Sequence, residues 1–108
     1  MVIADARLKQ HRVARAFGIR CYMNSMLEFG ITQAASLQHA ATMRNLIDVG
    51  HACMSALRLA EDPTDFSSFV REGVVHLPTA PGLGVQVDEQ QVRRLTVASD
   101  PGNPRLTL

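Results

Sequence analysis

The first fifty residues alternate between helix-like and strand-like segments, and this order constrains the fold more than any other feature of the sequence. In residues 5–17, apolar side chains recur at the spacing of one helix face. The alanine-rich segment 31–43 favours a second helix. Short apolar runs at 19–23 and 46–49 follow the two helices and predict strands. Helix, strand, helix, strand is the rhythm of parallel α/β units.

The second half of the chain has a different character. Residues 61–65 are acidic and contain Pro63, which predicts a turn. Asp88, with Gln91 three residues later, predicts a capped short helix that runs through Arg94. The strand-like runs between them are 69–70, 74–77 and 85–87. We therefore divide the chain into three parts, namely 1–60, a β-rich segment 61–97 and a flexible polar tail 98–108.

Composition excludes several classes of protein. The chain has 108 residues, which allows one small domain, and its net charge of +1 gives no support for a nucleic-acid partner. It has no apolar run of the roughly 18 residues that a membrane span needs, and its first ten residues lack a signal-peptide core. Two widely separated cysteines predict neither a disulfide framework nor a zinc site, so we expect a cytoplasmic protein.

Several motifs occur in an order that is similar to a known family. The most specific of them is Pro-Gly-Leu-Gly-Val followed by Asp-Glu. From Gly18 to about Leu95 the chain resembles the C-terminal part of the mandelate racemase and muconate lactonizing enzymes of the enolase superfamily. The resemblance covers most of this chain but only the last quarter or so of a typical member. The motifs that carry it are Ala16–Arg20, Ser25–Ile31, Gln33–Leu37, Leu77–Val85 and Val87–Glu89.

The resemblance implies an α/β fold, namely the C-terminal fragment of a TIM-like barrel. About two βα units would be followed by a short β-rich segment that returns to an N-terminal capping domain. Residues 5–17 would be the helix after strand six, and 19–23 would be strand seven. Residues 31–43 would be the next helix, 46–49 strand eight, and 66–95 the return to the cap.

The resemblance also implies a chemistry, that of acid-sugar dehydratases, racemases and cycloisomerases. These enzymes remove the proton next to a carboxylate, and Mg²⁺ stabilises the resulting enolate. Their metal ligands lie on strands three to five, and their catalytic lysines on strand two and often strand six. Lys9, the single lysine here, matches none of them. We therefore expect Mg²⁺ and a small carboxylate or acid-sugar substrate for the parent enzyme, and neither Mg²⁺ binding nor activity for this chain alone.

Three residues near the ends of the expected strands are candidate site residues, namely Glu28, Asp48 and His51. Glu28 is interpreted either as a polar group at the mouth of the active site or as a loop carboxylate beside a helix N-terminus. His51 aligns with a strand-eight acid of muconate-type members and could donate to an enolate oxygen. Asp48 takes that place if the register shifts. In the alternative interpretation, His51 is a loop histidine and Asp48 caps the end of the strand. Met26 stands near the position where mandelate-type racemases carry a catalytic histidine.

Other reactive residues favour structural interpretations. Cys21 and Cys53 are expected to be small buried apolar residues. A nucleophilic pair of Cys53 and His51 lacks a recognisable orienting group, and residues 81–84 lack the Gly-Lys-Ser/Thr ending of a phosphate loop. The remaining histidines, His11, His39 and His76, have no metal-ligand spacing.

Two functional hypotheses follow. In the first, the chain is part of an enolase-superfamily enzyme and acts only with the rest of the barrel. In the second, it is a small non-catalytic α/β protein that self-associates or binds a related subunit, because apolar strand edges recruit other chains. An adjacent coding sequence with a Lys-x-Lys strand and three strand-end acids would favour the first hypothesis.

Overall fold

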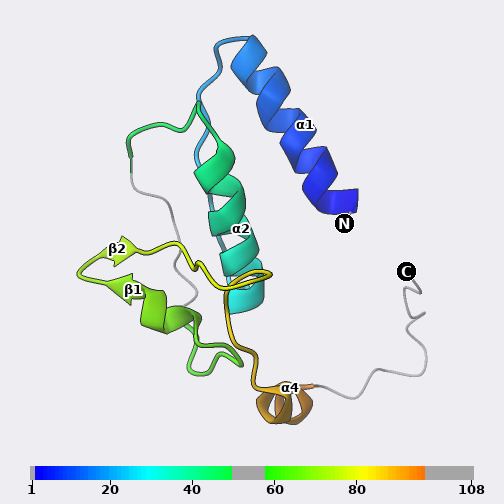
Figure 1. Cartoon of the computed structure of the whole chain (residues 1–108), viewed down its shortest axis with the longest axis vertical. Helices are drawn as coiled ribbons and strands as arrows, with labels where there is room; N and C mark the ends of the chain where they lie inside the picture. Colours follow the sequence, from blue (N-terminus) through cyan, green and yellow to red (C-terminus); the bar gives the residue numbers. More distant parts are fainter. Residues whose placement is uncertain (1, 50–57, 97–108) are drawn as a thin grey trace.

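The computed structural model describes residues 2–49 and 58–96 (Figure 1). Helix α1 spans Val2–Ala16 and helix α2 spans Gly30–Thr42. Both lie within three residues of the bounds that the sequence predicts. After α1 the chain turns at Gly18, whose φ of 69° is a conformation that favours glycine.

The two expected parallel strands are reduced to one isolated bridge between Cys21 and Leu46. Cys21 N donates to the carbonyl of Asn45, and Ile47 N donates to the carbonyl of Cys21, both at 2.8 Å. The parallel direction agrees with the prediction, whereas the predicted strand lengths, 19–23 and 46–49, are wrong. A lone pair of strands is marginal in water because it lacks neighbours on both outer sides.

The β-rich segment 61–97, which is called the return segment from here on, contains a small antiparallel hairpin in its described part. The 3₁₀ helix η1, Phe66–Phe69, leads into strand β1, Val70–Arg71, which pairs with β2, Val74–Val75. The two residues between the strands, Glu72 and Gly73, have φ values of 51° and 77°. Positive φ at both central positions is the geometry of a type I′ hairpin turn.

The β-rich prediction for this region was too extensive. The predicted run 74–77 forms a strand only at Val74–Val75, and 69–70 is shifted to Val70–Arg71. The run 85–87 contributes one antiparallel bridge, from Val87 to Thr64. Proline at 78 and 81 and the glycines at 82 and 84 interrupt the chain between these runs, which limits strand length.

The core lies between α2 and the return segment, which wraps around the lower half of α2 in Figure 1. Ala34 and Phe66 are 0% exposed, and Gln33 is 1% exposed. Further along α2, Gln38 Nε2 donates to the carbonyl of Pro78 at 2.8 Å. A Cβ added at Gly84 would lie 2.5 Å from Pro78 Cβ, so the glycine allows this turn to close tightly. The Pro-Gly-Leu-Gly run is therefore a packing turn.

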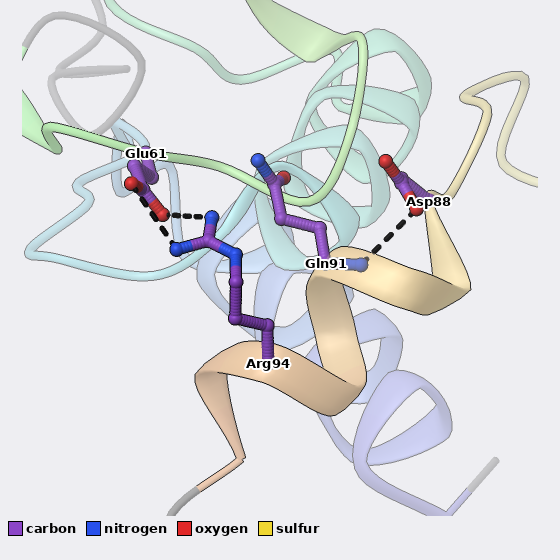
Figure 2. A network of polar contacts seen from close by, with 4 residues as sticks. All are labelled: Glu61, Asp88, Gln91 and Arg94. Carbon is purple, nitrogen blue, oxygen red and sulfur yellow. Dashed lines mark hydrogen bonds and ion pairs between the residues drawn. The ribbon is translucent and has the colours of Figure 1, made fainter.

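Helix α4, Glu89–Leu95, is fixed at both ends (Figure 2). Asp88 Oδ1 accepts hydrogen bonds from the backbone N–H groups of Gln90 and Gln91, which confirms the predicted N-cap. Arg94 forms a two-pronged ion pair with Glu61, the residue that opens the return segment. The hydrogen bond and the charge of Glu61 hold the pKa of Arg94 above its usual value.

Large apolar side chains remain exposed in the segment that contains the bridge residue Cys21. Phe17 is 76% exposed and Met26 is 75% exposed, and three further side chains of this group, Ile19, Tyr22 and Leu27, are also exposed. Among the described residues, no helix is long and apolar enough to cross a bilayer. These five side chains lie within residues 17–27, on both sides of Cys21 in the sequence, and are called the exposed apolar group below.

Candidate functional site

The site candidates follow the two segments joined by the parallel bridge. Residues 22–29 follow Cys21, and residues 47–49 follow Leu46. Because the bridge is parallel, both segments leave it in the same direction, at their carboxyl ends. In α/β barrels this is the side that carries the active site.

Glu28 lies in the loop that leads into α2. Its Oε2 accepts a hydrogen bond from Met26 N at 2.5 Å, and the residue is half-buried. The carboxylate therefore orders its own loop two residues before the first residue of α2, Gly30. The donor Met26 N belongs to the loop and not to α2, so both interpretations of Glu28, as a carboxylate that supports the helix N-terminus and as a group at the active-site mouth, stay predictions.

Asp48 and His51 differ in what the structure shows. Asp48 is exposed and lies two residues beyond the bridge residue Leu46, at the carboxyl end of the second strand segment. His51 lies outside the described residues, as does Cys53. The structure thus places Glu28 and Asp48 after the two strand ends and leaves the role of His51 as a prediction.

The first residue of α2 is held by a distant carboxylate that sequence reasoning missed. Phe29, the N-cap residue, has no side-chain cap, and Gly30 N donates instead to Asp62 Oδ2 at 2.7 Å. Asp62 Oδ1 accepts from Thr64 N at 2.9 Å and from Thr64 Oγ1 at 2.8 Å. The spacing Asp-x-Thr could have predicted the local turn, but nothing in the sequence signals a contact across 32 residues.

Gly30 is buried at this junction, and a larger residue does not fit. A Cβ at this position would lie 2.0 Å from Thr64 Oγ1 and 2.5 Å from Phe66 Cβ. Real Cβ atoms do not approach other atoms so closely. The glycine is therefore required by close packing between α2 and the return segment.

The chain matches a known family over most of its length. The family described as enolase C-terminal domain-like matches residues 5–91. The chain belongs to this family. The match begins within α1 and ends within α4, so it includes the bridge, α2, the hairpin and the Gly30 junction.

Curated relatives support the same assignment. The chain is 38% identical to a chloromuconate cycloisomerase of Cupriavidus pinatubonensis over 87 residues, which are 81% of this chain and 23% of that protein. It is 35% identical to muconate cycloisomerase 1 of Pseudomonas putida over 89 residues, 82% of this chain and 24% of that protein. An N-succinylamino acid racemase of Thermus thermophilus is 29% identical over 90 residues, 83% of this chain and 24% of that protein. The chain thus spans about a quarter of the length of these relatives. No solved structure matches it significantly.

This part of the family fold brings two histidines together. The rings of His11 on α1 and His39 on α2 lie 5.1 Å apart and are tilted by 57°. They line a cavity of about 440 Å³, together with half-buried Cys21 and Met43. Among the described residues, no group of three or more His, Cys, Asp or Glu could hold a metal ion.

Proposed function

We propose that this chain supplies the last two βα units and the return segment of an enolising enzyme of the muconate cycloisomerase type. The substrate would be a small carboxylate, and the remaining barrel units, in the same or a separate chain, would supply the metal ligands and the lysine bases. The observation that carries this proposal is the family match over residues 5–91, together with relatives of which the chain covers about a quarter.

The backbone geometry at the parallel bridge supports the proposal that further barrel strands pair with this chain. Cys21 directs both its N–H and its C=O toward residues 45–47. Backbone groups alternate in direction along a strand, so those of Tyr22 face the opposite side, and those of Leu46 face away from Cys21. Within the described residues, no backbone hydrogen bond reaches Tyr22 or Leu46. Among residues 2–49 and 58–96, two edges are thus unpaired, as strands seven and eight of a barrel require for pairing with strands six and one.

In this proposal the residues of this chain contribute to binding and proton transfer rather than to metal coordination. Glu28 and Asp48, which follow the two strand ends, would line the mouth of the site. His51 would donate a proton or a hydrogen bond to the enolate oxygen, a task that suits a side chain that titrates near neutrality. The protein is proposed to act in the cytoplasm.

A chimera tests the proposal directly. In it, residues 5–91 of this chain replace the matched segment of the Cupriavidus chloromuconate cycloisomerase. We expect the chimera, with Mg²⁺ present, to convert chloromuconate. We expect the 108-residue chain alone to incorporate no deuterium next to the carboxylate of any acid-sugar substrate in D₂O. A folded chimera without activity, or an isolated chain that exchanges this proton, would contradict the proposal.

The second candidate is a non-catalytic protein that self-associates or binds a related subunit. The unpaired strand edges among the described residues and the exposed apolar group of residues 17–27 favour it, because open edges and exposed apolar side chains are features of association surfaces. A folded but inactive chimera, together with a stable and well-ordered oligomer of the isolated chain, would favour this function over the first.

A further inference from the structure

The loop that carries Glu28 leads into α2, and the first residue of α2 is hydrogen-bonded to Asp62 of the return segment. We infer that Asp62 is a positioning residue for the site, because it holds the start of α2 and, through α2, the Glu28 loop. The inference rests on the proposed function and adds to it a residue that lies outside the strand ends. It assigns the return segment a part in organising the active-site mouth.

The first step of the argument is electrostatic. The first N–H groups of a helix have no partner within the helix, and the helix dipole makes its N-terminus a favourable place for a negative charge. Asp62 supplies that charge and accepts directly from Gly30 N. Hydrogen bonds to a carboxylate are roughly twice as strong as neutral ones. This contact replaces the cap that Phe29 cannot provide.

The second step is the rigidity of the anchor. Asp62 uses its other oxygen for two hydrogen bonds to Thr64, which fixes the orientation of the carboxylate. Thr64 Oγ1 also accepts from Phe66 N at 3.2 Å, and Phe66 is fully buried. The hydrogen bonds of Asp62 and Thr64 therefore connect the first residue of α2 to the core of the molecule.

The third step is the short path to the site. Glu28 is two residues from Gly30, a reach of at most about 7 Å of extended chain. The bond from Met26 N to the Glu28 carboxylate makes these residues one turn. A shift at Gly30 is therefore passed directly to the Glu28 carboxylate.

Two neighbouring acids provide matched controls. Asp65 Oδ1 accepts from Gln86 N at 2.8 Å, and Asp88 caps α4. Both bonds stay within the return segment. Replacing Asp65 removes the same charge from the same segment without removing the bond to Gly30.

The first experiment uses hydrogen–deuterium exchange on the full 108-residue chain, read by mass spectrometry on peptides that cover residues 24–35. Asp62→Ala should speed exchange there roughly fivefold, as expected for the loss of a helix cap. Asp62→Asn, which keeps one acceptor oxygen, should have a smaller effect, and Asp65→Ala should have none. Equal effects of Asp62→Ala and Asp65→Ala would overturn the inference.

The second experiment measures kcat and KM in the active chimera, where Asp62→Ala should lower kcat about tenfold or more through misplacement of a site group. If Asp62 acts through Glu28, the loss should largely disappear in a Glu28→Gln background. A merely structural role would instead give independent losses that multiply. An inactive wild-type chimera refutes the proposed function, whereas an active chimera with kcat unchanged by Asp62→Ala refutes this inference alone.

Discussion

Replacing Gly30 by alanine tests the packing between α2 and the return segment, because two physical effects predict opposite signs. Alanine is favoured over glycine in a helix interior by about 1 kcal/mol, and Gly30 is the first residue of α2. Helix propensity alone therefore predicts that Gly30→Ala stabilises the protein. The contacts at this residue predict the reverse.

The magnitude follows from the distances. Ordinary contact begins near 3.4 Å, and the new Cβ would lie 2.0 Å from Thr64 Oγ1 and 2.5 Å from Phe66 Cβ. Relief requires a shift of about 1 Å or more between α2 and the return segment, at a typical overpacking cost of about 1–3 kcal/mol. The same shift lengthens the bond from Gly30 N to Asp62, which adds about 1–3 kcal/mol for a charged partner. After the propensity gain of about 1 kcal/mol is subtracted, we expect a net loss of about 1–5 kcal/mol.

Urea unfolding of the full chain, followed by circular dichroism at 222 nm and fixed protein concentration, measures this loss. Ala35→Gly, at an exposed position of α2, is the matched control and should cost about 1 kcal/mol from propensity alone. Thr64→Ala removes the shorter contact, so Gly30→Ala should cost less in that background than in the wild type. Unchanged or increased stability of Gly30→Ala would refute the packing argument.

Three further predictions concern the rest of the molecule. Asp88→Ala removes the two hydrogen bonds that cap α4 and should cost about 1 kcal/mol, measured by urea unfolding against Glu89→Ala, which leaves the cap intact. The isolated chain should associate through its open strand edges at micromolar concentrations, as measured by sedimentation velocity. Tyr22→Pro removes an outward N–H and should shift the equilibrium toward the monomer. A monomeric wild-type chain would contradict this prediction. Titration calorimetry with Mg²⁺ should show no stoichiometric micromolar site on the chain alone, since such a site needs several convergent oxygens.

The helices could be predicted from the sequence because their signals are local. Apolar spacing, alanine content and Gly18 define α1 and α2, and Asp88 lies only two and three residues from the N–H groups that it caps. The strands could not be predicted in length, because a strand extends only as far as its neighbours pair with it. The segments around Cys21 and Leu46 have one neighbour each, so a single bridge forms.

The site shows the same division between local and distant causes. Glu28 and Asp48 could be placed after the strand ends from their order in the chain. The role of Asp62 could not, since its partner Gly30 lies 32 residues earlier and only the folded return segment brings them together. In the sequence, Gly30 is an ordinary residue at the start of a helix. Only its close contacts with Thr64 and Phe66 show that a glycine is required there.

The distribution of buried and exposed side chains indicates how this quarter of the family fold is held together. Its internal packing lies between α2 and the return segment, where Ala34, Phe66 and Gln33 are buried. Several large apolar residues of segment 17–27, including Phe17 and Met26, are exposed, although burial of apolar side chains stabilises a fold. The return segment can therefore fix the start of α2 before the bridge acquires its neighbouring strands. In the proposed enzyme, contacts with the return segment would order the Glu28 loop first. Pairing of the two open strand edges would then bring this loop close to the other catalytic residues.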